Sequence, residues 1–235
     1  MKLRFGLAAA LLLLPLAAAC GGGDDKGGGG GDDAFRQVLS TMVLQITDVP
    51  KGMQSLGSSF STNEDAASGL GGGPTKEQLD AWGRLLGHKN DFQASEPTAE
   101  SSVTAVSTSV SIYKTAQGAS DSFTDRVASA RAVDWKTSHS DLEDFQQEEP
   151  NRDLGVDDML WLHFTGYKEI APGDRRLISD DQVVFRVDRA WGFVGAVSTA
   201  ASGVDDRGFM LQSLEVLVKT QVQHIRDGLK SKDLQ

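Results

Sequence analysis

The sequence has little cysteine and no excess of positive charge, and each shortage excludes a class of protein. Its 235 residues contain a single cysteine, Cys20, so no intramolecular disulfide can stabilise the fold. The chain carries 23 lysines and arginines against 33 aspartates and glutamates. Because no basic stripe is present, nucleic acid is not an expected partner. Stability therefore has to come from an apolar core.

Sequence motifs typical of catalysis are also missing. The chain has no G-x-S-x-G and no H-E-x-x-H. Ser111 and Lys114 spell S-x-x-K, but they end an expected strand, where side chains three residues apart point to opposite faces. No S-D-N or K-T-G accompanies them. We therefore expect no catalytic residue and no enzyme activity.

The histidines and acidic clusters do not predict a metal site or a cofactor. The four histidines are His88, His139, His163 and His224. His139 and Asp141 could supply two metal ligands, but no third ligand is in view. The pairs Asp157–Asp158 and Asp180–Asp181 lack the spacing of a calcium loop. We expect them to be solvated ends of strands or loops.

The first 19 residues have the three parts of an export signal. Lys2 and Arg4 give a positive start, and an apolar run ends in small residues before Cys20. The run is about 15 residues long, shorter than the roughly 20 that span a bilayer. The stretch LAAAC at residues 16–20 resembles the lipobox of bacterial lipoproteins. The resemblance implies that residues 1–19 are removed and that Cys20 carries acyl chains, palmitate among them.

Residues 20–33 are expected to connect that anchor to a folded body. Gly21–Asp33 contains eight glycines, four aspartates and one lysine, and has no apolar side chain to bury. A glycine-rich chain of this length reaches about 20 Å. Without residues 1–19, the chain keeps 21 basic and 33 acidic residues, a net charge of −12. We expect residues 34–235 to form one extracytoplasmic domain held at the cell membrane by the lipid.

Hydrophobic spacing predicts four helices in that domain. The first covers Phe35 to Met42, with Asp33 as its cap. The second covers residues 75–87, opened by a capping box of Thr75 and Gln78. The third covers residues 116–133. The fourth covers residues 206–230 and has an apolar stripe of Leu211, Leu214, Val218, Val222, Ile225 and Leu229.

Alternating patterns predict the strands. Residues 106–113 place Val106, Val110 and Ile112 on one face and a serine row on the other, which we expect to be wet. Residues 158–167 form a second strand, and residues 182–199 form a hairpin that turns at Asp188–Ala190. The order of elements predicts an α+β fold. Its antiparallel sheet would carry the helices mostly on one face, with a long helix at the C-terminus.

Three segments resemble a loose set of bacterial extracytoplasmic domains. They are LQITDVPKG at residues 44–52, VSIYKTAQGASDSF at residues 110–123 and QVVFRVDRAWGFV at residues 182–194. Such domains occur in actinobacterial and Chloroflexi lipoproteins and as external sensor modules of membrane kinases, some with a PsbP-like α+β fold. The resemblance implies an extracytoplasmic domain and brings no catalytic residue.

Three functions follow as hypotheses. The first is a non-enzymatic surface lipoprotein that binds a partner protein or a cell-envelope component. The second is a carrier or sensor of a small apolar ligand, held in a pocket lined by Trp161, Phe164, Trp191 and Phe193. The third is a hydrolase with an unrecognised site.

Overall fold

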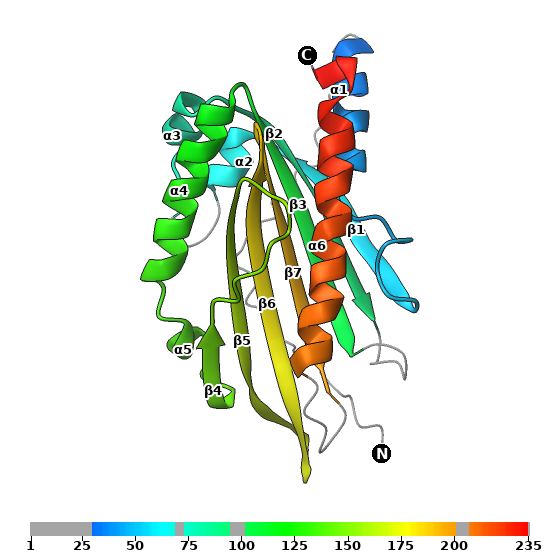
Figure 1. The fold of residues 1–235 in the computed structure, drawn as a ribbon, viewed down its shortest axis with the longest axis vertical. Coiled ribbons are helices and arrows are strands. Elements are labelled where there is room, and N and C mark those ends of the chain that lie inside the picture. The colour runs from blue at the N-terminus through cyan, green and yellow to red at the C-terminus, as the bar shows by residue number, and fades with distance from the viewer. Residues whose placement is uncertain (1–29, 69–72, 95–101, 201–206, 235) are drawn as a thin grey trace.

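The computed structural model describes residues 30–68, 73–94, 102–200 and 207–234. These residues form one sheet with helices packed against it (Figure 1). The elements are α1 (Gly30–Thr41), β1 (Met53–Ser61), α2 (Asn63–Ala67), α3 (Lys76–Ala81), β2 (Arg84–Ala94), β3 (Val103–Tyr113), α4 (Ala116–Ala132), α5 (Trp135–Ser138), β4 (Glu143–Glu148), β5 (Asp158–Ala171), β6 (Asp174–Val187), β7 (Ala190–Thr199), α6 (Arg207–Leu229) and the 3-10 helix η1 (Lys232–Leu234).

The sheet has seven strands in the order β1-β2-β3-β7-β6-β5-β4, and all neighbours are antiparallel. The α+β class, the antiparallel sheet and the long C-terminal helix are confirmed. The hairpin is also confirmed, because β6 and β7 are joined by Asp188 and Arg189. Among the described residues, no helix is long and apolar enough to cross a membrane.

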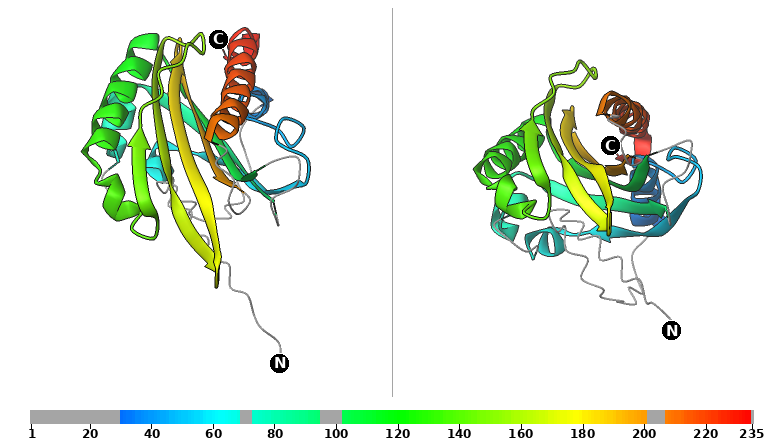
Figure 2. Two further views of the ribbon diagram at one scale, coloured as in Figure 1. Left: turned by 60° about the horizontal axis from the view of Figure 1, so that its bottom comes forward. Right: turned by 90° about the horizontal axis from the view of Figure 1, so that it is seen from below.

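The helices lie on both faces of the sheet, whereas the sequence predicted them mostly on one. α1 and α6 cover one face, and α4 and α5 cover the other (Figure 2). β6 explains the difference, since Val183 and Phe185 are buried toward α6 while Val184 is buried beside Phe123 of α4. A strand that is apolar on both sides needs cover on both sides.

The serine row of β3 is correspondingly not wet. Ser109 and Ser111 are buried. Tyr113, at the end of that row, shares a 2.7 Å hydrogen bond with Ser122 of α4. The helix that follows β3 therefore packs on the face that the serines had suggested was solvated.

The main core lies between the sheet and the two helices α1 and α6. The stripe predicted on α6 is confirmed, with Leu214, Val218, Val222 and Ile225 almost fully buried. Each such side chain contributes about 1.5–3 kcal/mol to folding. Gly192 of β7 lets this layer close, because a Cβ there would lie 2.5 Å from the Phe185 ring.

Two segments differ from the sequence predictions near the N-terminus. α1 begins at Gly30, so Asp33 lies inside its first turn, where the helix dipole also favours a carboxylate. The capping box of Thr75 and Gln78 is confirmed, but α3 ends at Ala81. Gly83, with φ of 73°, turns the chain, and the residues expected to continue the helix form β2.

Candidate functional site

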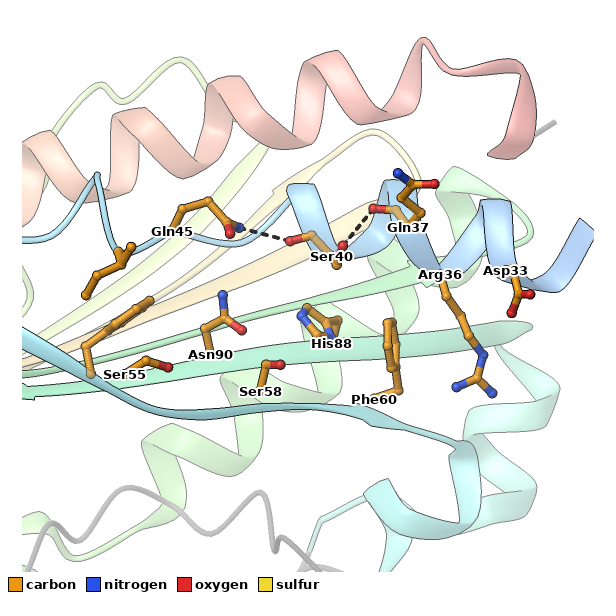
Figure 3. Close-up of a pocket in the computed structure, with 12 residues that line it drawn as sticks. Asp33, Arg36, Gln37, Ser40, Gln45, Ser55, Ser58, Phe60, His88 and Asn90 are labelled. Carbon is orange, nitrogen blue, oxygen red and sulfur yellow. Dashed lines mark hydrogen bonds between the residues drawn. The ribbon is translucent and has the colours of Figure 1, made fainter. Parts of the chain in front are cut away.

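A groove of about 660 Å³ runs between α1 and the two strands at the β1 edge of the sheet (Figure 3). We call it the α1–β1 groove. Its lining residues are Asp33, Arg36, Gln37, Ser40, Gln45, Ile46, Ser55, Ser58, Phe60, His88, Asn90 and Phe92. The first four come from α1, the next two from the following turn, and the others from β1 and β2. The turn is fixed by Asp48, whose Oδ2 accepts a 2.7 Å hydrogen bond from the backbone N–H of Gln45.

The floor of the groove consists of three cross-strand pairs. Phe60 lies opposite His88, Ser58 opposite Asn90, and Ser55 opposite Phe92. A β-bulge between Ser55 and Gly57 sets the third pair. Because Leu56 is the extra residue of the bulge, Ser55 takes its place on the floor.

Leu56 is left 65% exposed outside the floor. Gly57 permits the bulge, since its φ of 124° is strained for any residue with a side chain. The bulge thus puts a hydroxyl on the floor where strict alternation would have put a leucine.

A row of planar groups crosses one end of the groove. The rings of Phe60 and His88 have their centroids 4.4 Å apart, and the Arg36 guanidinium lies 5.0 Å from the centroid of Phe60. Figure 3 shows Arg36 and Asp33 extending from α1 toward the strands. The stack fixes Phe60 between an imidazole and a cation, and so holds α1 over the strands at this end.

Two side chains of the floor, His88 and Asn90, are almost fully buried, at 4% and 9% exposed. Burial lowers the pKa of His88, partly offset by hydrogen bonds to the Asn90 side chain and to the Ser59 backbone. The imidazole is therefore neutral at pH 7. His88 and Asn90 thus form a buried polar pair in the floor of the groove.

Hydrogen bonds on the α1 and α6 side of the sheet hold Asn90 in place through Leu44, whose backbone N–H donates to Thr108 Oγ1 at 3.4 Å. Asn90 Nδ2 donates to the Leu44 carbonyl at 2.9 Å. Thr108, opposite Asn90 on β3, donates at 2.7 Å to Gln221 of α6. Gln221 in turn donates to the Ser109 carbonyl at 2.8 Å. The Asn90 amide is thus held by the Leu44 carbonyl on one side and by the His88 side chain on the other.

The four aromatic residues proposed from the sequence as a pocket lie in three separate clusters. Trp161 belongs to the main core beneath α6, Phe164 packs with Trp135 of α5 on the opposite face, and Trp191 and Phe193 pack beside α4. Trp191 and Phe193 are therefore together, while the other two lie elsewhere. None of the four lines the α1–β1 groove. Cys20 lies outside the described residues.

The acidic pair Asp180–Asp181 is buried, which corrects the prediction that it is a solvated strand end. Asp181 accepts hydrogen bonds from Trp161 Nε1 at 2.8 Å and Ser179 Oγ at 2.5 Å, and it pairs with His163 at 2.8 Å. Consecutive carboxylates on a strand face opposite layers, and here each meets a histidine in its own layer. Since the Ser179 hydroxyl bonds to the carboxylate and not to the imidazole, this group lacks the order of a nucleophilic triad.

Asp180 faces the other layer and pairs with His139 at 3.2 Å. Burial disfavours the imidazolium of His139, but the Asp180 carboxylate and the Trp135 carbonyl outweigh it and raise the pKa of His139. Burial raises the pKa of Asp180. His139 thus pairs with the Asp180 carboxylate and packs against the aromatic rings around it. No group of three or more potential metal ligands occurs within the described ranges.

Comparison with solved structures gives a distant likeness in fold. No family model matches the chain, and no curated protein sequence matches it. The fold is similar to the extracellular domain of PknH from Mycobacterium tuberculosis. The TM-score is 0.44 and the identity 11%, over 79% of this chain and 96% of the PknH chain. A likeness to PknH at this level carries no functional inference.

Sequence reasoning missed the groove because it missed both strands of the floor. The alternation of His88, Asn90 and Phe92 is a strand signal, and it was available in the sequence. It was hidden by Leu85 and Leu86, which also fit the helical spacing of the preceding segment. Chemically, the groove offers hydrogen-bonding atoms and ring surfaces for a bound molecule, and no nucleophile among its lining residues is paired with a base.

Proposed function

We propose that this protein is a lipid-anchored extracytoplasmic lipoprotein whose domain recognises a cell-envelope component in the α1–β1 groove. The observation that carries the recognition role is the open groove of about 660 Å³ itself, into which α1, the following turn and two strands bring polar side chains and aromatic rings. The leader and Cys20 support the anchoring. Two acyl chains are the minimum for stable membrane attachment, and the lipobox resemblance implies them.

The anchoring is tested with the variant Cys20→Ser. We expect the wild-type chain to fractionate with membranes and the variant to appear in the soluble extracytoplasmic fraction, because the acyl acceptor is lost. Mass spectrometry of the mature wild-type chain should show a diacylglyceryl adduct on Cys20. An unmodified thiol there, or a serine variant that stays with the membrane, would contradict the proposal.

Recognition in the groove is tested with a photoreactive amino acid in intact cells. Placed at Ser58 on the floor, it should form an adduct with an envelope component, and the adduct should disappear in the His88→Phe background. The matched control is the same amino acid at Gln93, an exposed residue of β2 that alternation places on the opposite face. Equal adducts from both positions would show that the groove is not the recognition surface.

The second hypothesis, a carrier of a small apolar ligand, gains no support from the described residues. It requires one cavity lined by Trp161, Phe164, Trp191 and Phe193, and these side chains lie in three clusters on two faces of the sheet. Nine of the twelve residues that line the α1–β1 groove are polar or charged, while the surface that they present is of mixed polar and apolar character. We propose recognition of a component that offers both polar groups and an apolar face.

A further inference from the structure

A buried pair of titratable groups, His139 and Asp180, lies outside the α1–β1 groove. We propose that this pair is a pH-sensitive clasp, which holds α5 and the edge strand β4 on the sheet while it contains a proton and releases them when that proton leaves. Three features of the structure lead to the clasp, namely the contacts of the imidazole, its place between four elements and the charges around it.

Both ring nitrogens of His139 face acceptors. Nδ1 lies 2.9 Å from the Trp135 carbonyl oxygen, which cannot donate, so Nδ1 carries a proton. Nε2 lies 3.2 Å from Asp180 Oδ2, and a hydrogen bond there needs a second proton, either on Nε2 or on the carboxyl group. The closed pair therefore holds one proton more than a neutral imidazole beside an ionised carboxylate. Without that proton, lone pairs would face each other across the contact.

The adjacent pair of His163 and Asp181 has no such requirement. One N–H on His163 Nδ1 meets Asp181 Oδ1 at 2.8 Å, and Trp161 Nε1 and Ser179 Oγ donate to the same carboxylate. A neutral imidazole thus satisfies an ionised carboxylate in this layer. The need for an extra proton belongs to the pair on the other face of β6.

His139 connects four elements at the β4 edge of the sheet (Figure 1). It directly follows α5, and it pairs with Asp180 of β6. Its ring centroid lies 4.6 Å from that of Phe164 on β5 and 5.4 Å from that of Phe145 on β4. None of the six residues of β4 is buried, and its strand partner is β5. A short, exposed edge strand of this kind opens readily once a buried contact beside it is weakened.

The charges around the imidazole favour its protonated form. Asp180 faces it from β6, and Asp141, in the turn after α5, adds a second negative charge. Asp141 is held in turn by Lys168 Nζ of β5 at 2.7 Å. From β4 and β5, Phe145 and Phe164 present aromatic rings, which also attract a cation.

The clasp should open as the pH rises. Burial opposes the charge on His139, but Asp180, the Trp135 carbonyl and Asp141 together raise its pKa, and burial raises the pKa of Asp180. A released histidine titrates at about pH 6.5. The stabilisation is therefore complete below about pH 6.5 and is lost as the pH rises through the raised pKa. Release would uncover the rings of Phe145 and Phe164 and leave the backbone of β5 as the new edge of the sheet.

Hydrogen exchange of the full chain in detergent micelles measures the opening between pH 6 and pH 9. Each rate is divided by the intrinsic exchange rate at the same pH, so that protection alone is compared. We expect the protection of α5 and β4 amides to fall about tenfold over this range, which corresponds to a rise of about one unit in the pKa of the pair. The protection of β7 amides should change little. Protection of α5 and β4 that is constant with pH would overturn the proposal.

Nuclear magnetic resonance of the histidine rings follows the proton itself in the wild-type chain. The His139 signal is identified by its loss in His139→Gln. We expect its titration midpoint to lie above about pH 6.5. A midpoint at or below that value would show that the pair does not retain a proton, and the clasp would be wrong.

Asp180→Asn separates a proton-dependent clasp from a merely structural contact. The asparagine amide can donate to Nε2 of a neutral imidazole, so the closed contact no longer needs the extra proton. We expect α5 and β4 in this variant to have the same protection at pH 6 and pH 9. If the variant keeps the wild-type pH dependence, a different group titrates and the proposal fails. Should the variant not fold, the ring titration of the wild type decides.

The matched control is Arg175→Met. This substitution removes exposed ion pairs with Glu143 and Asp144 of β4 and leaves the clasp in place. It should lower the protection of β4 by the same factor at both pH values, so that the tenfold change with pH remains. Loss of the pH dependence in Arg175→Met would assign it to these surface pairs instead of the clasp.

Discussion

His88 is a buried imidazole whose protonation opposes folding. Burial lowers its pKa, and hydrogen bonds to the Asn90 side chain and the Ser59 backbone offset this only in part. The native state therefore resists protonation of this ring, while the unfolded chain takes up a proton below about pH 6.5. The stabilising contribution of neutral His88 is complete above about pH 6.5 and is lost as the pH falls from there through the lowered native pKa.

We predict that the free energy of unfolding depends less on pH in His88→Phe than in the wild type. The charged groups that share the groove with His88 are Asp33 and Arg36 of α1. Urea unfolding between pH 7.5 and 5 should show the wild type losing stability relative to the variant. Parallel pH profiles would contradict this reading of His88.

Arg84 is a buried guanidinium that is satisfied by neutral groups. It donates to Ser61 O at 3.0 Å, to Asn63 Oδ1 at 2.9 Å and to Ser111 Oγ at 3.2 Å. Burial lowers its pKa. Since the three acceptors come from β1, α2 and β3, the side chain connects the start of β2 to its surroundings.

We predict that Arg84→Met destabilises the fold by about 3 kcal/mol, because buried acceptors lose a charged donor. The measurement is urea unfolding at pH 7. The control is Arg131→Met, which removes an exposed ion pair with Glu149 and should change stability by less than about 1 kcal/mol. Equal effects of the two substitutions would show that the Arg84 contacts contribute little.

The contact between α4 and the end of α3 depends on Gly118. A Cβ at this position would overlap the Trp82 carbonyl oxygen and lie 3.0 Å from the Trp82 carbonyl carbon. An alanine usually stabilises a helix by about 1 kcal/mol over glycine. Here the overlap is with backbone, which cannot move aside as a side chain can.

We therefore predict that Gly118→Ala lowers the free energy of unfolding by about 2 kcal/mol, against its helix propensity. Gly73→Ala is the control, since a Cβ there meets nothing within 4 Å. Thermal unfolding compares the two variants. A Gly118→Ala variant as stable as the wild type would mean that α4 can move relative to α3 with little loss of stability.

The elements predicted correctly from the sequence are those in which one periodicity dominates. α6 has an uninterrupted stripe from Leu214 to Ile225, and β3 alternates over its last eight residues. β1 went unrecognised because Met53–Ser61 contains four serines and a bulge glycine, and no valine or isoleucine. Its strand character comes from pairing with β2, which local propensity does not show.

The candidate site is less predictable than the fold for the same reason. His88 and Asn90 become neighbours of Phe60 and Ser58 only through the register of β1 with β2. Arg36 reaches Phe60 only because α1 packs over those strands. Likewise, the wet serine row on β3 was a local interpretation that the packing of α4 overrides.

The two faces of the sheet share the same strands, and this should make the described domain unfold as one unit. β6 buries Phe185 beneath α6 and Val184 beside α4, and β7 divides Val194 and Phe193 in the same way. If these strands unfolded and released the helices on one face, they would also expose the apolar side chains that pack on the other face.

We predict that Phe193→Ala, on the α4 face, lowers the hydrogen-exchange protection of α6 amides as much as that of α4 amides. The expected loss is about 3–5 kcal/mol in both helices, the usual effect of removing a buried phenyl ring. Native-state hydrogen exchange measures the two helices in one experiment. Protection of α6 that stays at the wild-type value would show that the layers open independently.

α1 is at once a wall of the groove and the first described element after Cys20. Buried Leu39 within it, and Met42 directly after its last residue, hold it to the main core. Under the proposed lipid anchoring at Cys20, tension between the membrane and the domain would load α1 first, separate it from β1 and β2, and widen the groove. A molecule bound between α1 and the two strands would resist this separation. Ligand binding and mechanical load would therefore have opposite effects on the width of the groove.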